Sequence, residues 1–164
     1  MKKMLLLLLF TVPVMAQDGF KTEDGKIVWE RIFPEGSAEI KSLIESQENL
    51  KLLSSDDITY IGQGEAVKNT TSTTSVRLKC DANFNFSVVV APQGYIVRVT
   101  NFMFLEKYGP MQMRVVPNSL EKYYLEYGKI RNTPKTQEDL SHVDNFLTGI
   151  FSNQGIQSTA LTSN

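Results

Sequence analysis

Two alternating segments on either side of a short turn constrain the fold more than any other feature of the chain. Residues 84–91 place apolar side chains at every even position, and residues 95–99 place them at every odd position. Pro92-Gln93-Gly94 separates the two segments. A period of two indicates a strand with one buried face, and a turn this short joins antiparallel neighbours. The sequence therefore predicts an antiparallel hairpin whose strands span 84–91 and 95 to about 105.

Three further segments have the character of strands. Residues 27–33 and 58–67 are apolar and β-prone, and the segment 76–80 alternates so that Cys80 is expected on a buried face. Gly62-Gln63-Gly64 interrupts the second of these strands. Glycines inside a strand indicate a bulge or a close backbone approach, and we interpret them as a bulge. Because the strands from residue 58 onward follow one another with short connections, they predict an antiparallel meander.

Helices are predicted at three places. Ser37 is a candidate cap for a short helix with an apolar stripe, and residues 120–127 form a second short helix. The last helix has Thr136 as a candidate cap and a wide apolar stripe from residue 140 to residue 151, and it ends by Gly155. Strands and helices in this order predict an α+β fold. Its simplest form is a curved antiparallel sheet of about five strands with the helices packed on one face.

The first residues have the pattern of an export signal. Lys2 and Lys3 precede an apolar run that ends at Ala16, and this run is too short for a membrane-spanning helix of about 20 residues. We expect cleavage near Ala16 and a periplasmic or secreted protein with no integral membrane span. The predicted organisation is a signal peptide at 1–16, a flexible lead-in at 17–26, one α+β domain at 27–155 and a C-terminal tail at 156–164.

Charge and cysteine content exclude two classes of protein. The loss of Lys2 and Lys3 leaves a net charge of about −3, which is not the basic footprint of a nucleic-acid binder, and we expect no nucleic-acid partner. Cys80 is the only cysteine, so the chain cannot form an internal disulfide. An export signal without disulfides favours a bacterial envelope protein over a small secreted eukaryotic domain. We interpret Cys80 as a small core residue, because no base that would activate a thiol lies nearby in the sequence.

The order of these features resembles a known family. An export signal, the strand 27–33 with its helix, Asp57-Ile58-Thr59-Tyr60-Ile61-Gly62-Gln63-Gly64 and the hairpin 84–99 are similar to a secreted bacterial domain-of-unknown-function family with a TATA-binding-protein-like (TBP-like) fold. The resemblance implies the element order β-α-β-β-β-β-α and an envelope or secreted location. It implies no activity and no catalytic residues, and the region 106–137 departs from the family pattern.

The sequence contains no recognisable catalytic, cofactor or metal site. His142 is the only histidine, and although Asp139 lies one turn away, a solvated polar face is the preferred interpretation over a weak metal site. No serine lies in a Gly-x-Ser-x-Gly motif. Carboxylates such as Asp57 and Glu121 are present, but their sequence positions do not bring them together. We therefore expect no cofactor, and we favour a protein that is not an enzyme without excluding one.

Aromatic and basic residues in the second half are the candidate interaction surface. Tyrosines at a surface are typical of protein, peptide or carbohydrate contacts, although such residues more often belong to the core. The leading hypothesis is a non-enzymatic envelope domain that binds a protein or glycan partner through its sheet face or through this region. The alternatives are a small hydrolase that uses paired carboxylates on glycan or peptide, and a structural subunit of a homo-oligomer. The candidate surface consists of Phe102, Phe104, Tyr108, Arg114, Lys122, Tyr123, Tyr124, Tyr127 and Arg131.

Overall fold

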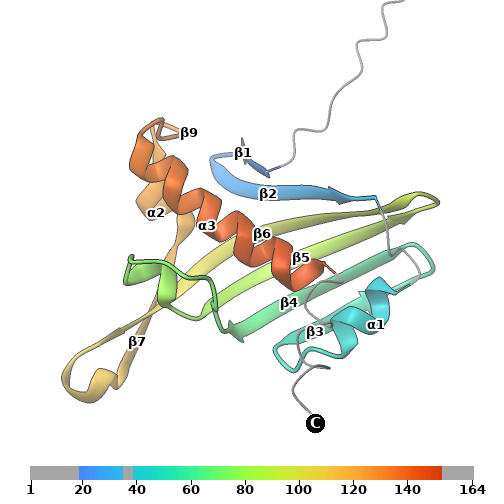
Figure 1. Cartoon of the computed structure of the whole chain (residues 1–164), viewed down its shortest axis with the longest axis horizontal. Coiled ribbons are helices and arrows are strands. Elements are labelled where there is room, and N and C mark those ends of the chain that lie inside the picture. The colour runs from blue at the N-terminus through green and yellow to red at the C-terminus, as the bar shows by residue number, and fades with distance from the viewer. Residues whose placement is uncertain (1–18, 35–38, 153–164) are drawn as a thin grey trace, which may run out of the picture.

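A curved antiparallel sheet dominates the computed structural model, which describes residues 19–34 and 39–152 (Figure 1). Six strands lie in the order β1-β2-β6-β5-β4-β3, and β7 pairs with the far end of β6. The strands of this sheet are β1 (Gly19–Glu23), β2 (Lys26–Phe33), β3 (Leu50–Ser55), β4 (Thr59–Val67), β5 (Ala82–Ala91), β6 (Gly94–Tyr108) and β7 (Arg114–Ser119).

The remaining elements are short, apart from the last helix. They are α1 (Ile40–Glu45), the 3₁₀ turns η1 (Arg77–Lys79) and η2 (Pro110–Gln112), α2 (Leu120–Tyr124), the small hairpin β8 (Leu125–Glu126) and β9 (Lys129–Ile130), and α3 (Pro134–Phe151). The fold is therefore α+β, as predicted. None of the helices in the described residues is long and apolar enough to cross a membrane.

The central hairpin confirms the prediction from the alternating segments. In the β5–β6 register Val88 lies opposite Val97, and the hairpin closes where Ala91 lies opposite Gly94. Gly94 has a φ of +142°, and a Cβ at this position would lie 2.0 Å from the carbonyl oxygen of Phe33. Only glycine fits this turn, because the turn also contacts the end of β2.

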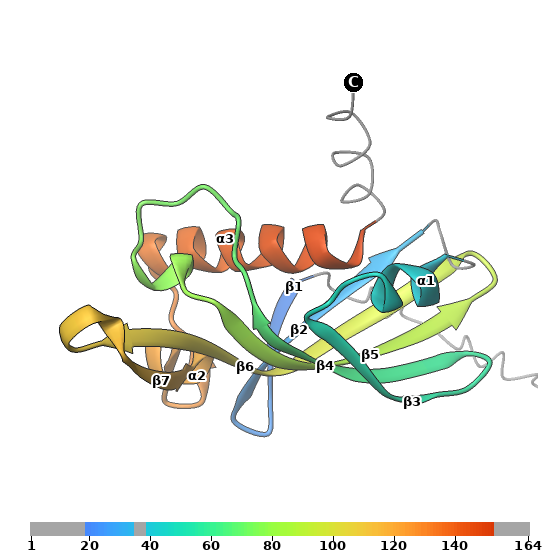
Figure 2. The same ribbon diagram turned by 90° about the horizontal axis from the view of Figure 1, so that it is seen from below.

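The long helix α3 covers one face of the sheet, and α1 covers the same face at its β3 edge (Figure 2). Strand β2 fixes the position of α3. The indole Nε1 of Trp29 donates a 2.8 Å hydrogen bond to Asp144, and Arg31 lies 3.1 Å from Asp144 and donates to Thr148 at 2.6 Å. Phe151, in the last turn of α3, packs beside Trp29 and two rings of β5. The core thus lies between α3 and the covered face of the sheet.

The sheet has more strands than the sequence predicted. The segment expected to be a flexible lead-in contains β1, which pairs with β2 along its whole length. Strands β3 and β7 were also not predicted. All three have a strand partner on one side only, and their side chains do not alternate cleanly between buried and exposed. Because edge strands bury less of either face, the pattern of period two is weak in them.

The predicted strand at 76–80 is wrong. Residues 77–79 form η1, in which Leu78 is fully buried while Val76 is exposed, and Cys80 is half-buried after the turn. A single buried side chain in a short polar segment suits a 3₁₀ turn as well as a strand. The alternation over so few residues could not distinguish the two.

Two helix boundaries also differ from the prediction. Helix α2 ends at Tyr124 instead of residue 127, and the chain then enters the β8–β9 hairpin. Helix α3 begins at Pro134, because Thr133 instead of Thr136 is its cap and accepts a 3.2 Å hydrogen bond from the backbone N–H of Thr136. The predicted signal peptide 1–16, the cap Ser37, the end at Gly155 and the tail 156–164 lie outside the described residues.

Gly62 and Gly64 allow aromatic rings to pack directly on the backbone of β4. A Cβ on Gly62 would lie 2.4 Å from the ring of Phe86, and one on Gly64 would lie 2.6 Å from the ring of Phe84. Both glycines pair regularly with β5, and that register shifts only after Gly64. The β3–β4 register shifts opposite Gly62, between Leu52 and Ser54, so the irregularity lies in the partner strand and not at the glycines themselves. The close backbone approach, which was the other interpretation of these glycines, is confirmed.

Candidate functional site

The structure divides the predicted aromatic surface into three groups. Phe102, Phe104 and Tyr124 are buried in the core beneath α3 and α2. The Tyr124 hydroxyl donates a 3.1 Å hydrogen bond to the buried carboxylate of Asp139. Side chains in this position hold the helices together and have no free surface to offer a partner.

The second group lies on the β8–β9 hairpin and on α2. Tyr127 is fully exposed at the β8–β9 turn, and Arg131 lies 4.0 Å from Glu126 across the hairpin. Lys122 donates a 2.6 Å hydrogen bond to Asn118 at the end of β7. These residues are accessible, but they line none of the cavities described below.

The third group surrounds Glu106, where β6 leaves the main sheet. The hydroxyls of Tyr108 and Tyr123 donate hydrogen bonds to the two carboxylate oxygens of Glu106. The Arg77 guanidinium lies 3.5 Å from the centre of the Tyr123 ring, and its Nε lies 3.6 Å from Glu106. We call Arg77, Glu106, Tyr108 and Tyr123 the Glu106 cluster.

The Glu106 cluster keeps its carboxyl group ionised. Partial burial alone would raise the pKa of Glu106, but the two tyrosine hydrogen bonds and the charge of Arg77 outweigh burial and lower the pKa below its usual value. The same contacts raise the pKa of Tyr108, chiefly through its hydrogen bond to Glu106. An ionised acceptor that two phenols already bind is suited to hold β6 against α2, and it is not suited to donate a proton.

A cavity of about 240 Å³ adjoins this cluster, and Cys80 contributes to its wall. Burial raises the pKa of the Cys80 thiol, and the neighbouring carboxylates of Glu106 and Asp81 raise it further. A thiolate is the nucleophilic form of cysteine, so this environment disfavours nucleophilic chemistry. Cys80 packs against the edge of the core but is only half-buried, so the prediction of a core residue on a buried strand face is wrong.

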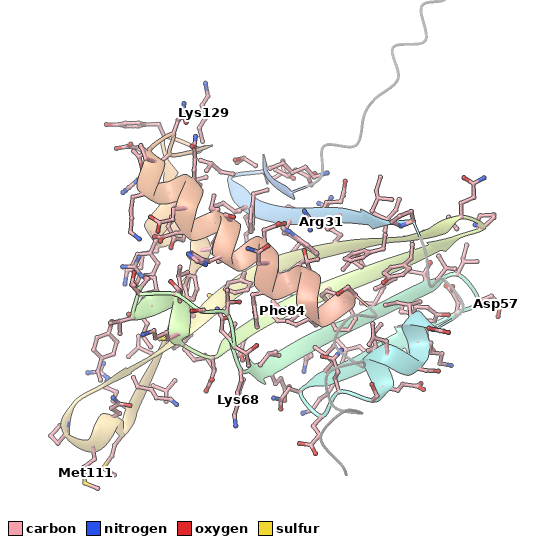
Figure 3. The ribbon with its side chains drawn as sticks, viewed as in Figure 1. Arg31, Asp57, Lys68, Phe84, Met111 and Lys129 are labelled. Carbon is pink, nitrogen blue, oxygen red and sulfur yellow. The ribbon has the colours of Figure 1, made fainter. Side chains whose placement is uncertain are left out.

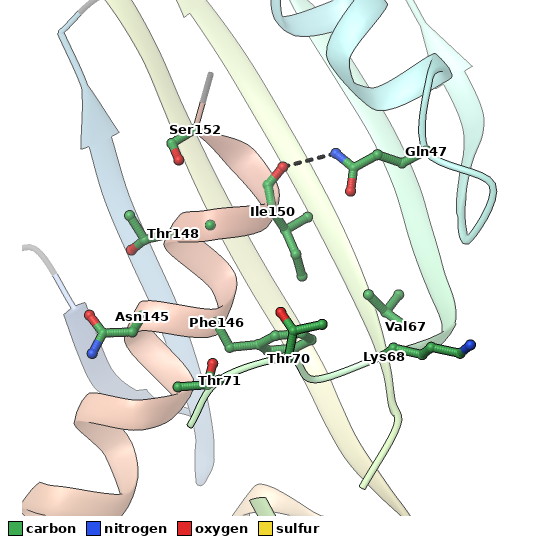
Figure 4. A pocket seen from close by; sticks show the side chains of 11 residues that line it. Gln47, Val67, Lys68, Thr70, Thr71, Asn145, Phe146, Thr148, Ile150 and Ser152 are labelled. Carbon is green, nitrogen blue, oxygen red and sulfur yellow. Dashed lines mark hydrogen bonds between the residues drawn. The ribbon is translucent and has the colours of Figure 1, made fainter. Parts of the chain in front are cut away.

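A larger cavity of about 530 Å³ lies between the second half of α3 and the segment after β4 (Figure 4). Gln47 crosses one end of it and donates a 2.9 Å hydrogen bond to the Ile150 carbonyl. Hydroxyl and amide side chains line much of the wall, and Lys68 is its single charged residue. The lining residues are Gln47, Val67, Lys68, Thr70, Thr71, Asn145, Phe146, Thr148, Gly149, Ile150 and Ser152.

Neither cavity contains the carboxylate pair that a hydrolase of the predicted kind needs. The carboxyl groups of Glu23, Glu65 and Glu106 all have lowered pKa values, whereas a general acid at neutral pH needs a raised one. Asp139 is buried and accepts from Lys135 as well as Tyr124, so it does not share a solvated face with His142. No group of three or more His, Cys, Asp and Glu side chains in the described residues could hold a metal ion.

The helix-free face of the sheet carries a contiguous aliphatic patch. Ile32, Ile96 and Val89 are successive cross-strand neighbours on β2, β6 and β5, and Ile61 on β4 lies diagonally next to Val89. Their side chains are exposed by 36% to 46%. We call these four residues the open-face patch. Antiparallel sheets that face water on one side normally carry polar residues there, so this patch is an unusual feature.

The patch was not predicted, although the sequence contains a signal for it. Val88-Val89-Val90 and Tyr95-Ile96-Val97 are apolar at consecutive positions, so that both faces of each strand carry apolar side chains. Continuous apolar strands are typical of sheets that are covered on both faces. Only the buried half of each run follows the alternation from which these strands were predicted.

Charged residues next to the patch neutralise one another. Arg98 forms ion pairs with Glu23 and Glu30, and Lys21 lies 2.9 Å from Glu30 and 3.1 Å from Glu23 (Figure 3 draws the side chains of the described residues). The hydrogen bond from Arg98, followed by that from Lys21, lowers the pKa of Glu23 to about 2. This part of the open face has no excess of positive charge with which to attract a nucleic acid.

The comparisons with known proteins define the fold. No protein-family model and no curated protein matches the chain. A DUF4468 family protein from Bacteroides ovatus aligns with a TM-score of 0.44 and 16% identity over 88% of this chain and 91% of its own. A TBP-like protein from Parabacteroides distasonis aligns with a TM-score of 0.53 and 11% identity over 88% of this chain and 98% of its own. The chain therefore has the fold of this TBP-like protein, as the resemblance implied.

Proposed function

We propose that this chain is a non-enzymatic binding domain that docks a protein partner on the helix-free face of its sheet. The observation that carries the proposal is the open-face patch. Its four aliphatic side chains are contiguous, exposed and held on the rigid central strands of the sheet. A contiguous apolar surface of this kind is typical of an interaction site.

The chemistry of the open face favours a protein over a glycan. Its described side chains are aliphatic, small polar or mutually ion-paired, and none of those that point to this face from β2, β4, β5 and β6 is aromatic. Carbohydrate sites commonly use aromatic rings as flat apolar surfaces. An uncharged apolar surface on another protein, with polar groups opposite the Arg98 ion pairs, complements this face.

An export signal would place this binding in the bacterial envelope or outside the cell. We propose that cleavage near Ala16 produces a mature chain that begins at Gln17. Intact mass measurement of the protein from an envelope fraction tests this part independently. A mass that includes residues 1–16 contradicts cleavage but leaves the docking proposal intact.

Site-specific photocrosslinking in the producing cells tests the docking proposal. A photoreactive amino acid is placed at Val89 or Ile61 on the patch, or at Val76 as a control, because Val76 is also an exposed apolar residue but lies at η1. We expect one protein adduct of the same mass from both patch positions and none of that mass from Val76. The adduct should be lost when Ile96→Thr removes apolar surface while keeping the β-branched shape.

Three outcomes contradict the proposal. The first is the absence of an adduct at the patch positions, and the second is the same adduct from Val76. The third is an adduct that Ile96→Thr does not reduce while the fold is intact. An adduct of exactly two chain masses would instead identify the homo-oligomer alternative, which sedimentation of the purified protein would then verify.

A further inference from the structure

Strands β6 and β7 extend beyond the rest of the sheet as a two-stranded arm (Figure 1). The last pair between β5 and β6 joins Ala82 to Phe104, whereas the pairing of β6 with β7 continues to Tyr108 and Arg114. Four residue pairs therefore lie beyond the last β5–β6 pair, which places the tip about 14 Å further out at about 3.4 Å per residue. We call residues 106–116 the arm.

The tip of the arm exposes apolar side chains that have no partner among the described residues. Met111 is 91% exposed and Met113 is 82% exposed, and Figure 3 shows Met111 at the far end of the arm. Tyr108 and Val115 are about half exposed behind them. These two methionines do not contribute to the packing of the fold, because their removal would not expose any buried side chain.

The tip of the arm carries one charged side chain, and this charge is positive. Between Lys107 and Leu120 the chain contains Arg114 but no aspartate or glutamate. Lys107 lies 3.5 Å from Asp81 at the base of the arm, and Arg114 is exposed and has no ion pair within the described part of the chain. The Glu106 carboxylate is already bound by the tyrosines and Arg77. The arm thus presents an apolar end with one cation beside it, Arg114, which is unpaired among the described residues.

We infer that the arm docks on an anionic lipid bilayer, with Met111 and Met113 in the interface and Arg114 against lipid headgroups. An apolar end with an unpaired cation beside it suits the boundary between headgroups and acyl chains of an anionic bilayer, where apolar side chains are buried and a cation is attracted to the headgroups. Flexible, polarisable methionine side chains adapt to such a soft surface. The open-face patch does not include any residue of the arm, and its one β6 residue, Ile96, lies ten positions before the arm begins, so this inference goes beyond the proposed protein docking and does not depend on it.

Glutamine substitutions remove the apolar character of the tip while keeping its shape. Gln112 already lies between the two methionines, and its φ of +57° equals that of Met111, so glutamine is compatible with this backbone. Both methionine side chains are exposed, so Met111→Gln with Met113→Gln leaves the core intact. Leu53→Gln on β3 is the matched control, since Leu53 is an exposed apolar residue on the opposite edge of the sheet.

Co-sedimentation with sucrose-loaded vesicles at low salt is the test. The purified chain from Gln17 onward is mixed with phosphatidylcholine vesicles that contain one quarter phosphatidylglycerol, and with pure phosphatidylcholine vesicles. We expect binding that favours the anionic vesicles. The double glutamine variant should lower the partition coefficient about tenfold or more, and Arg114→Gln about fivefold, while Leu53→Gln changes nothing.

Two results overturn the inference. One is failure of the wild-type chain to bind the anionic vesicles, which would assign the exposed methionines to a protein partner. The other is equal binding by the wild-type chain and the double glutamine variant. Near-ultraviolet circular dichroism of Trp29, the single and fully buried tryptophan, verifies that each variant is folded.

Discussion

Replacing Gly62 by alanine should destabilise the protein strongly. The new methyl carbon would lie 2.4 Å from the Phe86 ring and 2.5 Å from the carbonyl oxygen of Lys51. The ring cannot turn away freely, because the Phe151 ring packs against it with a centroid distance of 5.3 Å. The carbonyl belongs to the backbone of β3 and moves only with that strand.

The magnitude follows from these two contacts. Forcing an extra methyl into a packed site costs typically about 1–3 kcal/mol, and a clash with backbone lies at the upper end. Alanine restricts the unfolded chain more than glycine does, which returns about 0.5–1 kcal/mol at most. We therefore expect the free energy of unfolding to fall by about 2–2.5 kcal/mol.

Gly149→Ala is the matched control, and its effect should have the opposite sign. Gly149 lies inside α3, and a Cβ at this position would meet nothing within 4 Å. Alanine is favoured over glycine in a helix by about 0.8–1.0 kcal/mol, so the free energy of unfolding should rise. The same chemical change thus stabilises one element and destabilises another.

Urea denaturation followed by circular dichroism measures both variants. The result that refutes the reasoning is a Gly62→Ala variant within 0.5 kcal/mol of the wild type. It would mean that β3 and the Phe86 ring move aside at little cost in free energy, so that the contact between this ring and Gly62 does not hold β3 in place. A destabilised Gly149→Ala variant would equally contradict the open surroundings of that residue.

Three further predictions concern charge and reactivity. NMR titration should give Glu23 a native pKa of about 2, and Arg98→Gln should move it toward 4.5. Because the native value is the lower one, the stabilising effect of this carboxylate is complete above pH 4.5 and is lost as the pH falls toward 2; pH-independent stability in this window would contradict it. Iodoacetamide should alkylate Cys80 more slowly at pH 8 than it alkylates glutathione, because the pKa of this thiol is raised, and equal rates would contradict this. Dilute peroxide should oxidise Met111 and Met113 first among the described methionines, as peptide mass spectrometry can show, and earlier oxidation elsewhere would contradict their exposure.

The elements that could be predicted from the sequence are those in which a whole row of side chains along one side is buried. The hairpin of β5 and β6 and the helix α3 each bury one complete side, so their periods of two and 3.6 are plain in the sequence. Strands β1, β3 and β7 lie at edges, and their positions follow from pairing with distant segments, which no local pattern records. Pro117 in β7 even argues against a strand, although an edge tolerates it.

The candidate surfaces were predictable only in part. The aromatic residues were found by type, but whether Phe104 lies in the core and Tyr127 in solvent depends on which side of each element faces α3. The sequence could not predict that Glu106 binds several side chains, because Arg77 and Tyr123 reach its carboxylate from two separate segments. Ile96 and Val89 come together only through the strand register.

The pairing of β2 with α3 also determines when the chain can fold. The hydrogen bond between Trp29 and Asp144 joins residues 115 positions apart, and α3 leaves the ribosome after all the other described elements. A growing chain can form the local β5–β6 hairpin, but it cannot close the core until α3 has left the ribosome. Contacts between such distant residues slow folding and keep strand edges available for longer. The nascent sheet therefore keeps its face uncovered until α3 is synthesised, and the packing of α3 against β2 completes the core.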